Sequence, residues 1–577
     1  MFRFYSSSTG FVVLCYTIDI IPPGLPDVAN VHHNRASLQN RIPFNRRSHN
    51  QPPGSKVVRD WYDADSFSAE ATYEYHPVDN VKFSQCPQIK KHPLHYFVEN
   101  AQGHKDETLV AMDYGRFDFA CEDRVIAVVN TRKLSLSGTC HRGLWGYGGV
   151  AHATTPIAKG ETVQLTAPII YVKCIDNPHR HEVNHFILPI PSGTTPVGVP
   201  HNVLVLQIDG VGHRQYKALM KETQSALRQL KSATHFELPN VWANGENSAP
   251  NKFRMFCGDR GVTNACEAGL FMRYYKDKAF KTAWINEYAE NDMRLEMSIP
   301  FGNMGRKYID HIVANTYHRS LYGLDVAKLY FNVFRGGSGD LTAKELKYFQ
   351  LPTRAPGCVH QTHTATLHFQ YVDEFLQAYS PAKNGATGTN GGRALFLNNM
   401  QAHTNDWLSV SSVDAPLAAL LKRLDGRGAT PGGPAGLENT IIFLLGDHGI
   451  HGSPISGLLG GEHEHRNPMA TVIVPNRFLA QNKGVREVLQ KNKDRMISHY
   501  DTFAAIKALA DPPATAWAGA DPSKEHVLRG PHGGFNYFKE LVPDASCAER
   551  NIPLQYCNCW KKRTGCGYSK RDYVVES

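Results

Sequence analysis

The sequence lacks the marks of a membrane-spanning or nucleic-acid-binding protein. The sequence of 577 residues contains no apolar run that reaches the roughly 18 residues typical of a transmembrane helix. The 62 Lys and Arg residues are interspersed with 53 Asp and Glu residues, so the net charge of +9 forms no basic block beside a nucleic-acid motif. We see no internal repeat. These absences predict a globular protein without a nucleic-acid partner, and the mild positive charge favours an anionic substrate.

The signals for cellular location disagree with one another. Residues 10–18 form a short apolar run like the core of a signal peptide, but Arg3 is its only basic neighbour and Asp19 interrupts it. The chain also has no Asn-x-Ser/Thr glycosylation acceptor. Its 12 cysteines nevertheless gather on either side of the central region, which is typical of disulfide-bonded proteins in oxidising compartments. We therefore expect an extracellular protein or one in the lumen of the secretory pathway.

The cysteines fall mainly into two clusters. The first contains Cys86, Cys121, Cys140 and Cys174, and the second contains Cys547, Cys557, Cys559 and Cys566. We expect the second cluster to lie near the surface and to form disulfides at least in part. A zinc site is the alternative for these four residues, although Cys-Asn-Cys differs from the usual C-x2-C pair of zinc ligands.

An apolar run at residues 439–445 ends abruptly at Gly446, Asp447 and His448. Such a run predicts a buried strand of a parallel sheet. Open parallel sheets bind ligands just beyond the carboxyl ends of their strands. A carboxylate beside an imidazole at that position could hold a cation, although Asp and Gly are also ordinary turn residues after a strand.

A second apolar run, at residues 202–208, ends at Asp209. We predict that an amphipathic helix follows, because apolar residues recur near the helical period at Tyr216, Leu219, Met220, Leu227 and Leu230. A return strand is predicted at residues 236–242. The order of strand, acidic turn and helix is half of a βαβ unit and places Asp209 at the functional end of its strand.

Ser248 lies in a turn between Gly245 and Pro250 and is predicted to open the next helix. A hydroxyl there would face helix N–H groups and the positive end of the helix dipole, which suits an attacked phosphate or sulfate. A metal ion on the same oxygen would lower its pKa and make it a nucleophile. The alternative is that Ser248 only caps the helix.

In their order along the chain, Asp209, Ser248 and the Asp447-His448 pair resemble the alkaline phosphatase and sulfatase superfamily, in which such residues surround a metal ion. The chain is more specifically similar to the sulfatase-like family catalogued as domain of unknown function 229. That resemblance lies in residues 245–251, 446–449, 464–468 and 500–502 and in the cysteine-containing tail at 547–559. It extends approximately over residues 80–566. It implies a fold and a pattern of metal ligands, but the family has no established substrate.

The resemblance also implies roles for individual residues. Asp209, Ser248, Asp447 and His448 are expected to hold a divalent metal ion, which could be Zn, Ca, Mg or Mn. His403, which follows a strand-like run at 394–397, matches a histidine of the family and is expected to protonate a leaving oxygen, bind substrate or hold a second metal. The expected substrate-binding residues are Asn251, Lys252, Glu464 and Arg466. Arg466 would clamp an anion or instead pair with Glu464.

One departure from the sulfatase pattern affects the expected chemistry. Residues 248–252 are similar to the sulfatase signature of Cys or Ser, any residue, Pro, any residue and Arg, but they begin with Ser and end with Lys. A sulfatase needs the first residue of this signature to be oxidised to formylglycine, and eukaryotic maturation of that kind is expected to require Cys and Arg. An unmodified Ser248 favours attack on phosphorus.

We therefore predict an α/β fold with an alkaline-phosphatase-like, or sulfatase-like, core whose mostly parallel sheet lies between helices. The predicted parts are a disordered or targeting segment at 1–69, a small β-rich lobe at 70–195, a catalytic domain at 196–520 and a Cys-rich segment at 521–577. A helix with an apolar face is predicted around residues 413–424.

The predicted function is that of a metal-dependent hydrolase or transferase of phosphate or sulfate esters with Ser248 as the nucleophile. A true sulfatase that carries formylglycine at Ser248 is the first alternative. A non-catalytic extracellular binding protein that retains the fold is the second.

Overall fold

The structure is a computed structural model, and the description below is confined to the residues that it places. These are 6–7, 10–11, 75–77, 82–85, 125–130, 132–147, 155–166, 169–176, 183–189, 201–258, 270–286, 307–313, 358–359, 362–379, 392–403, 407–427, 436–450, 459–511 and 534–562. The chain forms two compact units, one made of Met1–Glu74 with Lys562–Ser577 and the other of Tyr75–Lys561. Everything below concerns the second unit. The predicted domain boundaries near residues 69, 195 and 520 lie outside the described residues and stay predictions.

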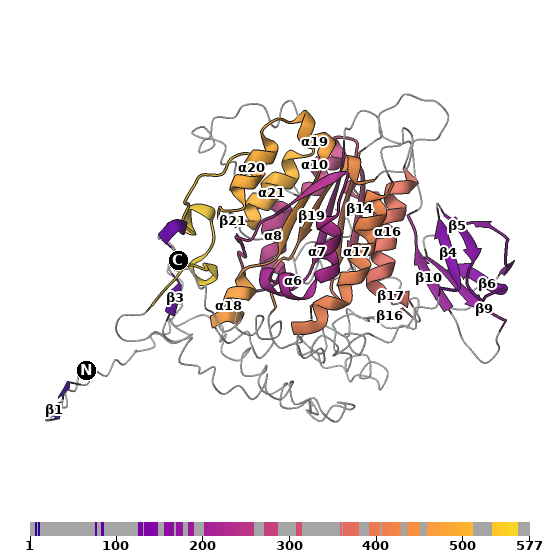
Figure 1. Ribbon diagram of the computed structural model, residues 1–577, viewed down its shortest axis with the longest axis horizontal. Coiled ribbons are helices and arrows are strands. Elements are labelled where there is room, and N and C mark those ends of the chain that lie inside the picture. The colour runs from indigo at the N-terminus through magenta and orange to yellow at the C-terminus, as the bar shows by residue number, and fades with distance from the viewer. Residues whose placement is uncertain are drawn as a thin grey trace. The chain divides into compact units, whose positions relative to one another are not determined.

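A mostly parallel sheet forms the centre of this unit (Figure 1). Its strand order is β12-β20-β19-β11-β18-β14-β15. The bounds are Ala233–Glu237 for β12, Ala470–Pro475 for β20, Thr440–Leu445 for β19, Asn202–Ile208 for β11, Arg393–Asn399 for β18, Lys281–Asn286 for β14 and His311–Val313 for β15. The strands from β19 to β15 are parallel, whereas β20 is antiparallel to both of its neighbours. The predicted α/β fold class is thereby confirmed.

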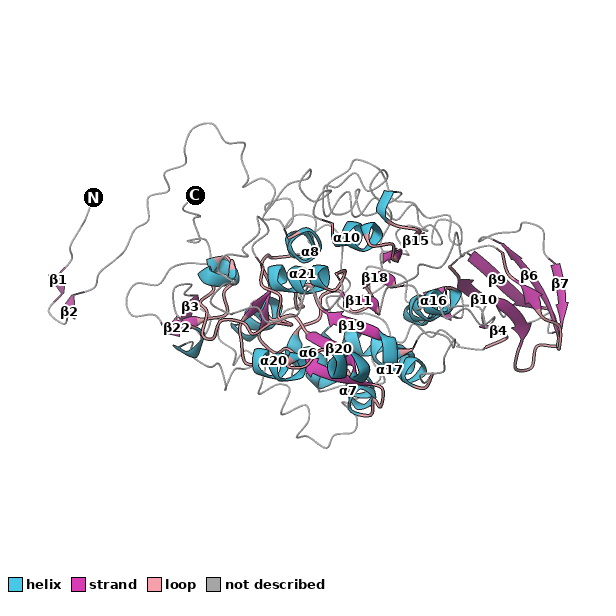
Figure 2. Ribbon diagram, turned by 90° about the horizontal axis from the view of Figure 1, so that it is seen from above, coloured by secondary structure: helices cyan, strands magenta, loops and turns pink. Residues whose placement is uncertain are grey.

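Helices cover both faces of the sheet, and Figure 2 shows α8, α10 and α21 on one side of the strands and α7 and α17 on the other. The first face is covered by α8 (Ser248–Cys257), α10 (Phe271–Asp277), α19 (Asn476–Gln481), α20 (Val485–Asn492) and α21 (His499–Ala508). The second face is covered by α6 (His213–Leu219), α7 (Lys221–Arg228), α16 (Thr364–Ala378) and α17 (Ser411–Asp425). No described helix is long and apolar enough to cross a membrane.

The alternation of side chains along each central strand explains the two cores. In β11, Val203 and Val205 join the core under α8, while Leu204 and Leu206 join the core under α17. Successive side chains of a strand point to opposite faces, so a strand covered on both faces must be apolar throughout. This is why the continuous apolar runs at 202–208 and 439–445 correctly predict central strands.

Two local predictions need correction. The helix predicted after Asp209 is interrupted at Met220, which ends α6 and begins α7 with φ −95° and ψ 58°. The return strand predicted at 236–242 is divided into β12 and the short β13 (Val241–Trp242), which pairs with β21 (Ile497–Ser498). Pro239 lies between the two pieces, and a proline cannot donate a hydrogen bond to a strand ladder.

The predicted helix around residues 413–424 is confirmed by α17, in which Val413, Leu417, Leu420, Leu421 and Leu424 are buried. Strands also form where the β-rich lobe was predicted. Two antiparallel sheets share one apolar core there: β4 (Ala127–Asn130), β5 (Lys133–Leu136) and β8 (Val163–Gln164) form the first, and β6 (Arg142–Tyr147), β7 (Thr155–Ala158), β9 (Ile169–Cys174) and β10 (Val183–Ile187) form the second. Cys140 and Cys174 form a disulfide in that core, with Cα atoms 5.8 Å apart.

The second cysteine cluster forms a disulfide between Cys547 and Cys557, with Cα atoms 5.9 Å apart. Cys559 is also disulfide-bonded. The expected surface location is wrong, because the side chains of Cys547, Cys557 and Cys559 are all 0% exposed. Cys86, Cys121 and Cys566 lie outside the described residues.

A buried histidine far from the carboxyl ends of the strands predicts a pH dependence of stability. His201 precedes β11, is buried and donates from Nε2 to the Leu509 carbonyl at 2.9 Å. Burial lowers its pKa from 6.5 to about 4, and the bond to Leu509 opposes that shift only in part. Between these two pH values the folded protein therefore binds fewer protons at His201 than the unfolded chain does. The free energy of unfolding consequently decreases as the pH falls from 6.5 to about 4.

His201→Gln should remove that pH dependence, because glutamine retains an N–H donor but does not titrate. Relative to the variant, the wild type should lose on the order of 3 kcal/mol of unfolding free energy on acidification, since one pKa unit corresponds to about 1.4 kcal/mol. Urea denaturation of both proteins at about pH 7.5 and about pH 4.5 measures the difference. A constant difference between them at the two pH values would contradict the prediction.

Candidate active site

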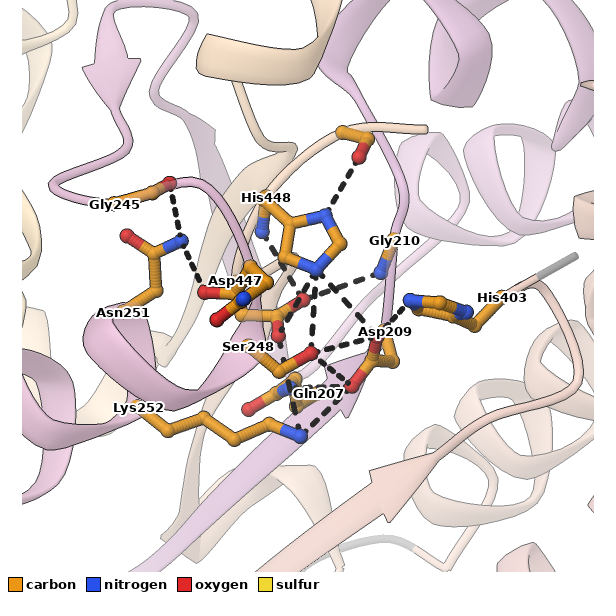
Figure 3. A network of polar contacts seen from close by, with 12 residues as sticks. Gln207, Asp209, Gly210, Gly245, Ser248, Asn251, Lys252, His403, Asp447 and His448 are labelled. Atoms are coloured by element: carbon orange, nitrogen blue, oxygen red, sulfur yellow. Dashed lines mark hydrogen bonds and ion pairs between the residues drawn. The ribbon is translucent and has the colours of Figure 1, made fainter. Parts of the chain in front are cut away.

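Three adjacent parallel strands bring distant residues together at their carboxyl ends. In the ladder between β11 and β19, Gln207 pairs with Leu445, so Asp209 and Asp447 follow their strands at the same level. On the other side of β11, Ile208 pairs with Asn399 of β18, which leads to His403. Figure 3 shows that the side chains of Asp209, Asp447 and His448 turn toward one another. The convergence that the sequence predicted is therefore present.

Ser248 is the first residue of α8 and points into this group (Figure 3). Its Oγ lies 3.2 Å from each carboxylate oxygen of Asp209 and 3.2 Å from Nε2 of His448. The turn before it needs glycine at Gly245, because a Cβ atom there would collide with the ring of Pro250. Ser248 is 5% exposed, whereas Glu246 and Asn247 beside it are exposed, so the hydroxyl lies just below the surface.

Lys252 supplies positive charge to the buried carboxylates from the next turn of α8. Its Nζ donates to Asp209 Oδ2 at 2.8 Å and lies 4.0 Å from Asp447 Oδ2. Burial alone would raise the pKa of Asp209, but the charges of Lys252, His403 and His448 outweigh that effect and lower it. Asp209 is therefore an anion at neutral pH.

Asp447 is held differently. Its Oδ1 accepts hydrogen bonds from the backbone N–H groups of Gly210, at 3.1 Å, and His448, at 3.0 Å. Burial and the nearby charge of Asp209 raise its pKa, while His448 and Lys252 act in the opposite direction. Its Oδ2 accepts no hydrogen bond of ordinary geometry from the described residues and lies 3.7 Å from His448 Nε2.

The tautomer of His448 follows from its other ring nitrogen. Nδ1 lies 2.7 Å from the carbonyl oxygen of Gly449, and a carbonyl can only accept, so Nδ1 carries the proton. In the neutral ring Nε2 then presents a lone pair toward Ser248 and Asp209. This is the arrangement of a histidine that ligates a metal ion and is oriented by a backbone carbonyl.

The donors in this site fit a divalent cation. Asp209, His403 and His448 each offer one ligand atom within 4.8 Å of the other two. His403 Nε2 lies 3.5 Å from Asp209 Oδ1, so this histidine, predicted as a catalytic residue, lies beside the predicted metal ligands. The Asp447 Oδ2 atom provides a further buried oxygen without an ordinary hydrogen bond. The cluster of Asp209, His403 and His448 contains His403 in place of the predicted ligands Ser248 and Asp447. One carboxylate and two imidazoles suit Zn²⁺ or a similar ion and leave the identity of the metal open.

The predicted substrate-binding residues occupy different environments. Lys252 lies inside the site, as described above. Asn251 is fully buried and uses its amide within the turn: Oδ1 accepts from Asn244 N at 2.8 Å, and Nδ2 donates to the carbonyls of Gly245, at 2.9 Å, and Asn247, at 3.0 Å. Its observed contacts therefore hold the loop that carries Ser248.

Glu464 and Arg466 belong to α18 (Leu459–Arg466), the helix that follows β19 in the chain. Glu464 is fully buried, and its Oε1 accepts from the backbone N–H of Gln215 in α6 at 2.8 Å. Burial raises its pKa to about 7, with Gln215 and Arg214 acting in the opposite direction. The carbonyl of Arg466 accepts from Ala243 N at 2.8 Å. Both residues therefore connect α18 to the segments that carry Asp209 and Ser248.

Sequence analysis overlooked two residues that orient the site. Gln207 Nε2 lies 3.5 Å from Asp209 Oδ2, and His499 Nε2 donates to the Asp447 carbonyl at 2.6 Å. Gln207 could have been noticed as a polar residue in an otherwise apolar central strand. His499 directly precedes the 500–502 motif, but nothing local indicates that it reaches Asp447. His465, which lies between Glu464 and Arg466, donates from Nε2 to the Glu246 carbonyl at 2.6 Å.

The comparisons with known proteins agree with the predicted family. The family described as "Protein of unknown function (DUF229)" matches residues 342–569, which include His403, Asp447, His448 and the cysteine-containing tail. The predicted resemblance to that family is confirmed, although the match begins after Asp209 and Ser248. No curated protein matches the chain.

Several solved structures are similar to the chain at low sequence identity. A protein of the alkaline phosphatase superfamily from Vibrio parahaemolyticus is 12% identical, with a TM-score of 0.35, over 60% of this chain and 73% of that chain. The soluble domain of lipooligosaccharide phosphoethanolamine transferase A from Neisseria meningitidis is 14% identical, with a TM-score of 0.32, over 55% of this chain and 91% of that chain. An alkaline phosphatase from the Antarctic bacterium TAB5 is 13% identical, with a TM-score of 0.31, over 54% of this chain and 98% of that chain.

Removing either carboxylate should weaken metal binding. Asp209→Asn and Asp447→Asn each withdraw a charged oxygen from the donor set, so the metal content after dialysis should fall severalfold, whereas Ser248→Ala should retain most of it. Elemental analysis of the purified proteins measures this. Asp414→Asn is the control, because Asp414 is a buried carboxylate that accepts from Glu222 N and Thr223 N away from the site. Unchanged metal content in both site variants would refute the metal site.

Lys252→Met should destabilise the metal-free protein, because it leaves the buried charge of Asp209 without its ammonium partner. Loss of one partner of a buried ion pair costs about 3–5 kcal/mol of unfolding free energy. A saturating divalent cation should reduce the loss by supplying the missing charge. Urea denaturation with and without the cation measures both effects. Lys217→Met is the control, because Lys217 pairs with Glu237 at 2.9 Å near the surface, where such pairs contribute about 0–1 kcal/mol.

Proposed function

We propose that this protein is a metal-dependent hydrolase or transferase of phosphate or sulfate esters in which Ser248 is the nucleophile. The position of Ser248 Oγ carries this proposal, since the hydroxyl lies 3.2 Å from both Asp209 and His448 at the start of a helix. The N-cap position of α8 belongs to Asn247, and the hydrogen bonds of Ser248 Oγ run to Asp209 and His448 instead, which supports a role for Ser248 other than capping.

The residues around Ser248 divide the work of ester cleavage. A divalent cation, when bound by Asp209, Asp447 and His448, supplies positive charge that favours the serine alkoxide and draws electrons from the ester. The start of α8 directs its backbone N–H groups toward an anion beside Ser248. Lys252 keeps Asp209 ionised and adds a positive charge beside the reacting group.

The reaction proceeds by two displacements. Ser248 Oγ gives up its proton to water and forms a bond to the phosphorus or sulfur atom, and the bond from that atom to the leaving oxygen breaks. His403, beside Asp209, donates a proton to the leaving oxygen. Water in a hydrolase, or an acceptor hydroxyl in a transferase, then gives its proton to His403 and displaces Ser248, whose oxygen takes a proton from water so that the serine hydroxyl is restored.

Roles for the remaining predicted residues follow from their contacts. Asn251 positions the loop at residues 244–247, which leads to Ser248 and is called the nucleophile loop below. Glu464 contacts α6, and the Arg466 carbonyl contacts the backbone directly before this loop. Arg466 is partly buried, and we retain it as the candidate for contact with the anionic substrate.

An unmodified Ser248 favours phosphate esters over sulfate esters, because a serine oxygen can displace at phosphorus without further oxidation. Mass spectrometry of the peptide that contains Ser248 distinguishes serine from formylglycine. Turnover of an aryl phosphate with unmodified serine would support the phosphate assignment, and a formylglycine mass with aryl sulfate turnover would support a sulfatase instead.

Ser248→Ala should abolish turnover while the fold and most metal binding persist, because the nucleophile and the metal act as a unit. His403→Ala should reduce kcat less, on the order of 10²- to 10⁴-fold, as expected for loss of a proton donor. Steady-state assays with aryl phosphate and aryl sulfate, with metal content determined in parallel, measure both effects.

Ser232→Ala is the matched control for this test. Ser232 Oγ also donates to a carboxylate, that of Asp425, but it lies before β12 and away from the site. Its variant should turn over substrate at the wild-type rate. Near wild-type turnover by Ser248→Ala would mean that water is the nucleophile, and the serine mechanism would be wrong.

A further inference from the structure

The C-terminal segment at residues 546–559 packs directly behind the loop that carries Ser248. The disulfide between Cys547 and Cys557 closes this segment into a ring, inside which the N–H groups of Arg550 and Ile552 donate to the Cys547 carbonyl at 3.1 and 2.9 Å. Ile552 and the buried cysteines form an apolar cluster with Trp242 and Met496. The ring is therefore anchored on β13, immediately before the nucleophile loop.

Asn244 connects the ring to that loop. Its side chain is fully buried, with Nδ2 donating to the Asn551 carbonyl at 2.9 Å and Oδ1 accepting from His499 N at 3.0 Å. Its backbone N–H donates to Asn251 Oδ1 at 2.8 Å. Asn244 thus joins three parts of the chain: the C-terminal ring, the start of α21 and the first turn of α8.

The connection continues from Asn244 to the nucleophile. Asn251, which accepts from Asn244, donates to the carbonyl of Asn247, and Asn247 directly precedes Ser248. On the other side, His499 donates to the carbonyl of Asp447. A displacement of Asn244 would therefore change the position of Ser248 relative to Asp209 and Asp447.

The direction of the Asn551 carbonyl is set by the ring itself. Asn551 has φ +56°, a left-handed conformation that glycine and asparagine adopt more readily than other residues. The disulfide and the two bonds to the Cys547 carbonyl hold this turn in place. The ring thereby holds the Asn551 carbonyl in position to accept the hydrogen bond from Asn244. In the sequence, this ring follows all the motifs of the predicted metal site.

We propose that the C-terminal Cys-rich segment is part of the framework of the active site and that Asn244 is a positioning residue for Ser248. The catalytic part of this inference rests on the proposed function. The bond from Asn244 to the Asn551 carbonyl fixes the backbone of residues 244–247, and with it the distance from Ser248 Oγ to Asp209. Positioning errors of about 1 Å reduce catalytic rates by on the order of 10²-fold.

Asn244→Asp tests the proposal with a side chain of the same shape. The carboxylate can still accept from His499 N, but it cannot donate to the Asn551 carbonyl and is repelled by it. We expect kcat to fall by about 10²-fold with KM changed by less than about 3-fold, because the reacting geometry is lost while substrate contacts remain. Amide hydrogen exchange in residues 244–250 should accelerate at least about 10-fold.

Asn492→Asp is the matched control. Asn492 is also fully buried, and its Nδ2 donates to the carbonyls of Tyr537 and Lys539, both at 2.7 Å, while Oδ1 accepts from Leu541 N at 3.0 Å. This variant should lose stability to a similar extent but keep the wild-type kcat and the wild-type exchange in residues 244–250. Equal loss of stability in both variants, with unchanged exchange in 244–250 for Asn244→Asp, would overturn the proposal.

A second pair of variants tests the other end of the bond without altering Asn244. Asn551→Ile strains the left-handed residue and moves its carbonyl, whereas Asn551→Gly adopts the same φ readily. The first should accelerate exchange in residues 244–250, and the second should not. Similar exchange in both would overturn the proposal even if Asn244→Asp failed to fold. If wild-type protein cleaves neither aryl ester, the proposed function fails, while the exchange measurements still decide whether the ring positions the loop.

Discussion

The arrangement of the site depends on two carboxylates that the parallel sheet places side by side away from water. Asp209 and Asp447 follow adjacent strands in register, and both side chains are 0% exposed. Two like charges on neighbouring side chains repel strongly where the surroundings are poorly polarisable, and burial alone disfavours the ionised form of each carboxyl group. The fold must therefore supply compensating positive charge and hydrogen bonds at this point. Lys252, Ser248, two backbone N–H groups and the neighbouring histidines all serve that requirement.

The same constraint explains why Ser248, the proposed nucleophile, and Lys252 share one helix. Residues four positions apart lie on the same face of a helix, so α8 directs Ser248 and Lys252 toward one target. The helix also begins at Ser248, which adds the positive end of its dipole. Compensation of Asp209 and preparation of the hydroxyl therefore come from a single short element, whose start is fixed by Gly245, Pro250 and the Asn251 amide.

Local sequence signals predict the parts of the site that depend on one strand or one turn. The continuous apolar runs before Asp209 and Asp447 identify central strands because both faces of the sheet are covered. The sequence does not predict that β20 runs antiparallel to β19 or that β12 pairs with β20 at the edge, because either direction buries the same alternating side chains. The interruption at Met220 was likewise missed, since the apolar positions continue through it with helical spacing.

Contacts between distant segments explain the remaining differences. His499 and His465 hold the Asp447 turn and the nucleophile loop through backbone carbonyls, and a carbonyl leaves no mark in the sequence. The tail cysteines suggested a surface element because cysteine clusters often staple exposed lobes, yet three of them pack around Trp242 behind the site. A histidine or asparagine that donates to a main-chain oxygen can be recognised only when the fold is known. The proposed chemistry of Ser248 is thus indicated by a few short motifs, whereas its position depends on residues spread from β11 to the C-terminal ring.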